Sequence, residues 1–223
     1  MEDKDLSPRV TRYLYLLISF CYLSCNIDVG IFAISPNQIS YNLGIDISMV
    51  GLLSSAIYMG NVAGTLIGPF LFAKMRAKHV IIAASIVNAL FVSSFLVTSN
   101  FWILFSTRFI TGLAKVMFVI YFPVWIDQHA PPASQTMWIS LYFLTVPIGL
   151  IIGYFSTSLI IGDNNESNDY RYGFLLQSVL MIFPISVCFM LFPAKYYEQI
   201  DEDNKPASSA INEQLSMSVT DKG

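Results

Sequence analysis

The chain has 223 residues, of which 55% are hydrophobic and only 12% carry a charge. Soluble domains usually have about 25% charged residues, and the mean hydropathy here is +0.59, so a water-soluble globular protein is excluded. The net charge of −3 says little about partners, and no nucleic-acid binding is expected. Long stretches lack Asp, Glu, Lys and Arg, as between Asp46 and Lys74 or Lys78 and Arg108. Because a bilayer span needs roughly 20 apolar residues, the sequence predicts an all-α polytopic membrane protein.

Six transmembrane helices are predicted in chain order. They cover Arg12–Ser35, Ser48–Phe72, Lys78–Thr98, Phe101–Ile126, Thr136–Ile160 and Tyr172–Phe192. The residues before the first span are too polar for a cleaved signal peptide, and the composition becomes polar and acidic after Pro193. We therefore expect a cytoplasmic N-terminal segment (1–11), a six-helix transmembrane bundle (12–193) and a disordered cytoplasmic tail (194–223).

Lysine and arginine residues alternate between the two sides of the predicted bundle. They precede the first span, separate the second from the third and follow the sixth, at Lys4, Arg9, Arg12, Lys74, Arg76, Lys78, Lys195, Lys205 and Lys222. The connections after the first, third and fifth spans contain only Arg171. The positive-inside rule then places both termini in the cytoplasm. Asn165 begins an Asn-Glu-Ser sequon on the outer side, which is either a glycosylation site or a chance match.

Two ionisable residues lie well inside predicted spans. Burying a charge in a bilayer costs about 2.5–3.5 kcal/mol on insertion scales, so each is a candidate functional residue. With a rise of about 1.5 Å per residue, Asp28 in the first span and Arg108 in the fourth reach a similar depth. We expect them to pair, which offsets the cost of burial. Alternatively, each finds water or backbone carbonyls separately.

Lys115 lies two turns beyond Arg108 on nearly the same helix face. Together these two cations predict a polar cavity that favours an anionic group. Asn61 in the second span and Asn88 in the third are further polar candidates. The alternatives are snorkelling of Lys115 toward the cytoplasmic interface and helix–helix hydrogen bonds made by the two asparagines.

Small residues recur every fourth position on two spans. They are Ala56, Gly60, Gly64 and Gly68 in the second span, and Thr145, Gly149, Gly153 and Thr157 in the fifth. This spacing lets helix backbones approach closely. Because each group of three spans opens with an ionisable residue and carries such a seam on its second helix, we predict two inverted three-helix repeats. The seams predict contact with a second bundle; the alternative is packing among these six spans alone.

These features together resemble the N-terminal half of the major facilitator superfamily. Asn26–Gly30 resembles the Asp-x-Gly motif of that family's first helix, and Arg108–Gly112 resembles the R-x-x-x-G motif of its fourth. Gly68–Lys78 is similar to a degraded form of the cytoplasmic loop motif G-x-L-x-D-R-x-G-R-R/K. Gly112–Lys115, followed by Pro123, resembles the corresponding part of the fourth helix in the spinster-like branch. The resemblance covers nearly all of the six-span region.

The resemblance implies transport of a small organic solute by alternating access. In this family two six-helix bundles enclose the substrate, and the six spans correspond to one of them. A second bundle, from another copy or from a missing C-terminal half, would complete the site. Expected partners are then the bilayer, the solute, protons and that bundle. Substrate binding and coupling would fall on Asp28, Asn61, Arg108 and Lys115.

Two departures from the family pattern alter these expectations. Phe72 stands where the loop motif has aspartate, so a cytoplasmic gate built from Lys74, Arg76 and Asp127 would be weaker. Lys115 stands where the spinster-like branch has an acid. That substitution counts against lipid-type substrates and against proton coupling by a carboxylate at this position.

Other function classes have little support in the sequence. The two histidines lie far apart, and no nucleophile, metal-ligand or phosphate-loop pattern occurs, so neither an enzyme nor a cofactor or metal is expected. The alternative to transport is a non-transporting membrane protein, either a binding or regulatory half-protein or a truncated gene product.

Overall fold

The computed structural model describes residues 8–161, 169–182, 184–193 and 196–197, and no β-strand occurs among them. The helices are α1 (Pro8–Ser24), α2 (Ile27–Ile34), α3 (Pro36–Leu43), α4 (Ile47–Lys74), α5 (Ala77–Val92), α6 (Ser94–Val97), α7 (Phe101–His129), α8 (Gln135–Ile160), α9 (Tyr170–Ile182) and α10 (Pro184–Leu191). Five helical segments of the described chain are long and apolar enough to cross a bilayer. They are Arg9–Ile34, Ile47–Lys74, Ala77–Val97, Phe101–His129 and Gln135–Ile160. The sixth predicted span contains residue 183, which lies outside the described residues, and it stays a prediction.

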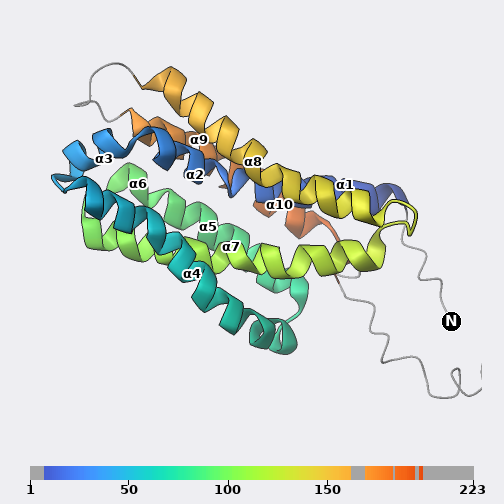
Figure 1. Ribbon diagram of the computed structural model, residues 1–223. Helices are drawn as coiled ribbons and strands as arrows, with labels where there is room; N and C mark the ends of the chain where they lie inside the picture. The colour runs from blue at the N-terminus through green and yellow to red at the C-terminus, as the bar shows by residue number, and fades with distance from the viewer. Residues whose placement is uncertain (1–7, 162–168, 183, 194–195, 198–223) are drawn as a thin grey trace, which may run out of the picture.

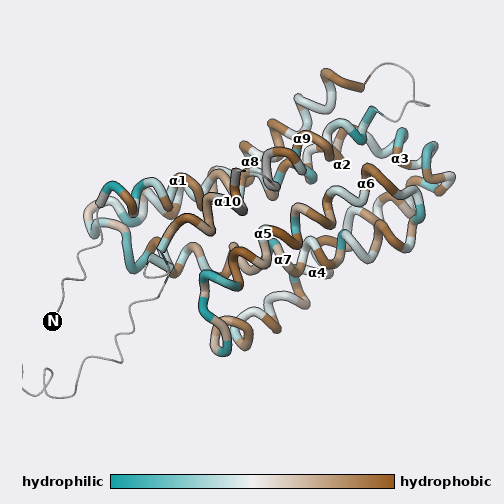
Figure 2. The backbone as a smooth tube through the Cα atoms, turned by 180° about the vertical axis from the view of Figure 1, so that it is seen from behind, coloured by the Kyte–Doolittle hydropathy of each residue, from teal (hydrophilic) through white to brown (hydrophobic). Residues whose placement is uncertain are grey.

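The helices form an elongated bundle in which successive connections alternate between the two ends (Figure 1). The connections α3–α4 and α6–α7 lie at one end, and α4–α5 and α7–α8 lie at the other, where α1 begins. The most hydrophilic stretches gather at these ends, at the start of α1, at α3 and at the α4–α5 turn (Figure 2). This arrangement suits repeated crossing of a bilayer, because each helix satisfies its own backbone hydrogen-bonding groups within the hydrocarbon core. The sequon at residue 165 and residues 198–223 lie outside the described part.

The first predicted span is interrupted in its middle. α1 ends at Ser24, and α2 begins at Ile27. At this break the side-chain amide of Asn26 donates to the carbonyl of Tyr22, at 2.6 Å, which satisfies a buried acceptor inside the span. The break places Asp28 in the first turn of α2, where the positive end of the helix dipole favours a carboxylate.

α4 and α7 touch backbone to backbone. A Cβ atom added to Gly60 of α4 would overlap the carbonyl of Phe109, and one added to Gly112 of α7 would overlap the carbonyl of Ile57. Gly64 continues the contact one turn further along α4. The two helices can approach this closely only because these positions carry no side chain.

α8 meets α1 and α2 in the same way. A Cβ atom on Gly153 would overlap the carbonyl of Ile27, and one on Gly30 would overlap the carbonyl of Leu150. Gly149, one turn earlier on α8, lies against the backbone of α1. α4 and α8 therefore flank the bundle, and each contributes one glycine-lined strip to its interior.

The small-residue seams of the second and fifth spans thus face neighbours within this bundle. The prediction that they face a second bundle is wrong, and the alternative of packing among these spans holds. The physical reason is that the helix backbones meet at the seams, whereas the outward faces carry large exposed side chains such as Val62 and Phe155. The glycines buried in these crossings are Gly60, Gly64, Gly68, Gly149 and Gly153.

The chain after α10 packs back onto the bundle. The indole Nε1 of Trp125 donates to the carbonyl of Tyr196 at 2.7 Å, and the hydroxyl of Tyr121 donates to the carbonyl of Tyr197. Both tyrosines at 196 and 197 are buried. Residues 196 and 197 therefore pack against α7. We call this contact of residues 196–197 with α7 the C-terminal latch.

Candidate functional site

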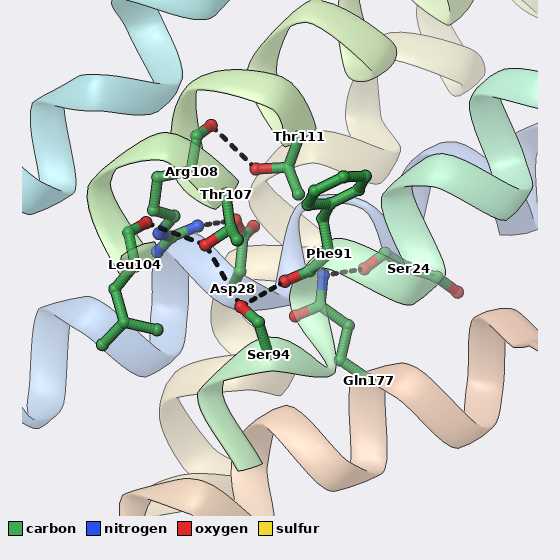
Figure 3. A network of polar contacts seen from close by, with 9 residues as sticks. All are labelled: Ser24, Asp28, Phe91, Ser94, Leu104, Thr107, Arg108, Thr111 and Gln177. Carbon is green, nitrogen blue, oxygen red and sulfur yellow. Dashed lines mark hydrogen bonds and ion pairs between the residues drawn. The ribbon is translucent and has the colours of Figure 1, made fainter. Parts of the chain in front are cut away.

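Asp28 of α2 and Arg108 of α7 form an ion pair in the interior of the bundle. Nη1 of Arg108 donates to Oδ2 of Asp28, and the side chains of Arg108 and Asp28 are only 3% and 2% exposed. The predicted pairing is confirmed. It is the one ion pair between residues that the structure describes. Figure 3 shows the carboxylate and the guanidinium facing each other between the two helices.

Three phenylalanine rings surround the guanidinium of Arg108. Its central carbon lies 3.8 Å from the ring centre of Phe32, 5.4 Å from that of Phe95 and 5.9 Å from that of Phe174. Phe95 and Phe174 stack on each other with centres 4.3 Å apart, and Phe32 meets both edge to face. A cation over an aromatic face is attracted by the ring quadrupole. We call these three side chains the aromatic box.

Side-chain hydrogen bonds tie neighbouring helices together around the pair (Figure 3). The hydroxyl of Ser94 donates to the hydroxyl of Thr107 at 3.1 Å, which ties α6 to α7 next to Arg108. The side-chain amide of Gln177 donates to the carbonyl of Ser24 at 3.0 Å, which ties α9 to α1. Parts of the first, third, fourth and sixth predicted spans therefore converge on this region.

The ion pair is only partly satisfied. Oδ1 of Asp28 and Nε of Arg108 are buried and have no hydrogen-bond partner among the described residues. A buried charge normally uses all its hydrogen-bonding capacity. The pair therefore keeps one acceptor atom and one donor atom that no described residue uses.

Lys115 and Asn61 lie apart from the ion pair. Lys115 of α7 is 6% exposed, and it makes no hydrogen bond or ion pair with any residue that the structure describes. Asn61 of α4 is half-buried, and its Oδ1 has no partner within the described ranges. The Oδ1 atom of Asn88 on α5 is also unpartnered there. The helix–helix hydrogen bonds considered for these asparagines are not made by these oxygen atoms.

The expected gate residues do not form a charge network. Lys74 and Arg76 are exposed at the α4–α5 turn, and the described residues contain no ion pair between Arg76 and Asp127. Asp127 instead accepts a hydrogen bond from the side chain of Gln135. Phe72 stacks on Tyr121, with ring centres 5.5 Å apart and planes 12° from parallel. An aromatic contact therefore lies where the family motif would place a charge.

Sequence reasoning did not find the aromatic box. Its rings come from α2, α6 and α9, and phenylalanine is common in every predicted span. No local spacing links such residues before the fold is known.

The fold and the buried ion pair define an integral, multi-pass helical membrane protein. The family profile described as Major Facilitator Superfamily matches residues 15–218. The chain belongs to this superfamily, whose members mediate membrane transport.

The curated relatives include spinster and glucose transporters. The chain is 25% identical over 162 residues to the Arabidopsis thaliana protein described as "Probable sphingolipid transporter spinster homolog 1", covering 72% of this chain and 32% of that protein. It is 26% identical over 156 residues to "Solute carrier family 2, facilitated glucose transporter member 10" of Xenopus tropicalis, covering 68% of this chain and 27% of that protein. The chain thus spans about a third or less of the length of these relatives.

Proposed function

We propose that this chain supplies one six-helix bundle of a transporter that moves a small organic solute by alternating access. The observation that carries the proposal is the buried pair of Asp28 and Arg108. Replacing a buried ion pair by apolar residues often leaves stability unchanged or raises it. A bundle that only had to fold would therefore gain little from this pair, whereas a transporter can use it as a switch.

The proposed switch works by protonation of Asp28. A proton on the carboxylate would remove its charge and weaken its hold on α7. Arg108 would keep its place against the aromatic box, whose ring faces would offset part of the cost of leaving its charge unpaired. Breaking and remaking this contact would let α2 and α7 shift relative to each other as protons and solute exchange.

Lys115 and Asn61 are the proposed contacts for the solute. Lys115 has no counter-ion among the described residues, so an anionic group on the solute would offset the cost of burying its charge. Asn61 offers an amide that hydrogen-bonds to either a donor or an acceptor. The proposed roles are thus coupling at the ion pair and solute binding at these two residues.

An inverted repeat of three helices underlies the proposed architecture. Where α4 crosses α7, residue 57 contacts residue 112 and residue 60 contacts residue 109. Where α8 crosses α2, residue 150 contacts residue 30 and residue 153 contacts residue 27. Each α8 position lies 93 residues after its α4 counterpart, and each α2 position lies 82 residues before its α7 counterpart. This constant correspondence supports a repeat of helices 1–3 in helices 4–6.

We place the N-terminal segment and the tail that follows the latch in the cytoplasm, because the basic residues gather on that side. The gate at this end would be aromatic rather than charged, through Phe72 and Tyr121. A second bundle, on this or another polypeptide, would contact the outward surfaces of α4 and α8. Both helices expose many large apolar side chains there.

Uptake into liposomes tests the proposal. The chain would be reconstituted with an imposed pH gradient, and uptake of radiolabelled gluconate, glucose and glutamate would be compared with that of protein-free liposomes. We expect uptake of at least one probe, abolished by Asp28→Asn. Binding of a probe without flux would instead favour the binding or regulatory half-protein. Neither binding nor flux by folded chain would contradict the transport proposal.

A further inference from the structure

Four polar side chains lie along one face of α4. Ser54, Tyr58, Asn61 and Thr65 are spaced by four, three and four residues, which places them within about one sixth of the helix circumference. They cover about 16 Å of a predicted membrane span at 1.5 Å per residue. Ser54 and Asn61 are half-buried, Thr65 is exposed, and Tyr58 is 57% exposed. We call this set the polar stripe.

The stripe divides the surface of α4 into distinct faces. On one side, the glycine strip packs against α7. On the other side, Val62 and Leu66 are 67% and 70% exposed and form part of the apolar outward surface of α4. The stripe lies between them, so it borders both α7 and the outside of the bundle.

The hydrogen-bonding groups of the stripe are largely unused. Among the described residues, the hydroxyls of Ser54 and Tyr58 have no hydrogen-bond partner, and Oδ1 of Asn61 has none. Thr65 donates to the backbone carbonyl of Asn61 at 2.8 Å and keeps its acceptor capacity. Lipid tails cannot hydrogen-bond to such groups, so exposure to hydrocarbon would be costly. Such groups require water or a polar partner rather than lipid tails.

The stripe lies close to the buried ion pair because α4 crosses α7 beside it. Ile57, next to Tyr58 of the stripe, touches Gly112, one turn from Arg108. Gly60, next to Asn61 of the stripe, touches Phe109, the residue after Arg108. A ligand on the stripe is therefore adjacent to the proposed switch.

We propose that the polar stripe lines a water-filled path and binds the hydroxyl groups of the transported solute. This inference rests on the proposed function and names the solute class. No Asp, Glu, Lys or Arg occurs between Asp46 and Lys74, so the stripe offers only neutral groups. Hydroxyl and amide side chains both donate and accept, which matches ligand hydroxyls that do the same.

Cysteine labelling tests whether the polar stripe is accessible to water. Single cysteines would replace Ser54, Tyr58, Asn61 or Thr65 in a chain whose three natural cysteines are changed to alanine. The matched controls are Val62→Cys and Leu66→Cys, which lie on the same helix at the same depth. The full chain in membranes would be treated with the charged, water-soluble thiol reagent sodium (2-sulfonatoethyl) methanethiosulfonate. We expect the stripe cysteines to react at least about tenfold faster than the controls.

Protection of the stripe cysteines from labelling by added solutes tests the solute class. Gluconate and glucose carry hydroxyl groups, and gluconate also carries the anionic group proposed to bind Lys115, whereas glutamate carries charge without a hydroxyl. We expect one of the two hydroxyl-bearing probes to slow labelling at Ser54→Cys and Thr65→Cys more than fivefold, and glutamate to have no such effect. Protection by glutamate alone, or by no probe, would overturn the hydroxyl assignment.

The labelling and uptake experiments together separate this inference from the proposed function. Stripe cysteines that react no faster than Val62→Cys would overturn the water-filled path, because the stripe would then contact lipid or a dry protein surface. Fast labelling with selective protection but no uptake into liposomes would uphold the binding surface and contradict transport. Uptake with an unreactive stripe would uphold transport and contradict this path.

Discussion

At the scale of single residues, the two partners of the buried pair should not be equally costly to remove. Asp28→Leu leaves a guanidinium that cannot lose its proton, and an unpaired buried charge costs about 3–5 kcal/mol. Arg108→Leu leaves a carboxylate that can take up a proton and become neutral. We therefore expect Asp28→Leu to destabilise the bundle more than Arg108→Leu, as measured by unfolding in mixed detergent micelles.

The double variant Asp28→Leu/Arg108→Leu provides the control for this asymmetry. Because it removes both charges, its stability should return to within about 1 kcal/mol of the wild-type value. A double variant as unstable as Asp28→Leu alone would mean that packing, rather than charge, determines the loss.

Phe32 should contribute to holding Arg108 through its ring face. It is the nearest of the three box rings, at 3.8 Å, whereas Phe174 lies at 5.9 Å. A double-mutant cycle of Phe32→Leu with the charge-free double variant removes the packing contribution common to both backgrounds. We expect a coupling free energy of about 0.5–2 kcal/mol for Phe32 and a smaller one for Phe174→Leu. Equal coupling for the two rings would argue against a cation–π contact.

At the scale of whole helices, the glycine crossings predict the direction in which alanine substitutions change the stability of the bundle. Gly60→Ala and Gly153→Ala each place a methyl group against a neighbouring backbone carbonyl, so each should destabilise the bundle, by at least about 1–3 kcal/mol. Gly51→Ala is the matched control on α4, since a Cβ there meets nothing within 4 Å. Because alanine favours helix by up to about 1 kcal/mol over glycine, Gly51→Ala should be neutral or stabilising.

The measurement for these variants is again the unfolding midpoint in mixed micelles. Similar losses for Gly60→Ala and Gly153→Ala would agree with equivalent crossings in two repeats. A loss at only one of them would show that the two crossings are not energetically alike.

Hydrophobic runs and charge gaps located the long helices to within a few residues. The second predicted span, Ser48–Phe72, corresponds to α4, Ile47–Lys74. The interruption of the helix before Asp28 was missed because Cys25 and Asn26 lie in an otherwise apolar stretch. Composition alone predicts one continuous span through such a stretch. α3 was also missed, since its signals are local, with Pro36 at its first turn and Gly44 at φ 61° after its end.

The candidate site could be predicted only where it depended on charge. An isolated charge in a span needs a partner, so Asp28 and Arg108 could be paired by depth. The direction of the glycine seam could not be predicted, because four-residue spacing specifies a close contact without specifying the neighbour. Which helices cross depends on the packing of all the spans together, and the sequence pattern of α4 is the same for either partner.

At the scale of the whole molecule, the C-terminal latch joins the end of the bundle to α7. The carbonyls of residues 196 and 197 are held by Trp125 and Tyr121, more than 70 positions earlier. α7 also carries Arg108, so a movement of this helix in the proposed switch would be transmitted to residues 196 and 197.

The latch should open at high pH. Burial raises the pKa of Tyr197 above its ordinary value, and nearby Cys188 adds to this effect. The hydroxyl donates to the carbonyl of Phe189 at 3.0 Å. Below an ordinary tyrosine pKa of about 10 the docked state keeps its full stability. As the pH rises above that value, an undocked tyrosine ionises more readily than the docked one, so docking weakens progressively.

A fluorophore attached at Glu198→Cys would report latch opening through its anisotropy. We expect the anisotropy to fall between about pH 10 and pH 11.5 in the otherwise cysteine-free chain. In Tyr197→Phe the hydrogen bond is absent, so docking should be weaker by about 0.5–1.5 kcal/mol at neutral pH, and this titration should disappear. Tyr121→Phe serves as the second control, because its hydroxyl also donates into the latch. A transition that persists in Tyr197→Phe and vanishes in Tyr121→Phe would assign the titration to Tyr121 and contradict the role of Tyr197.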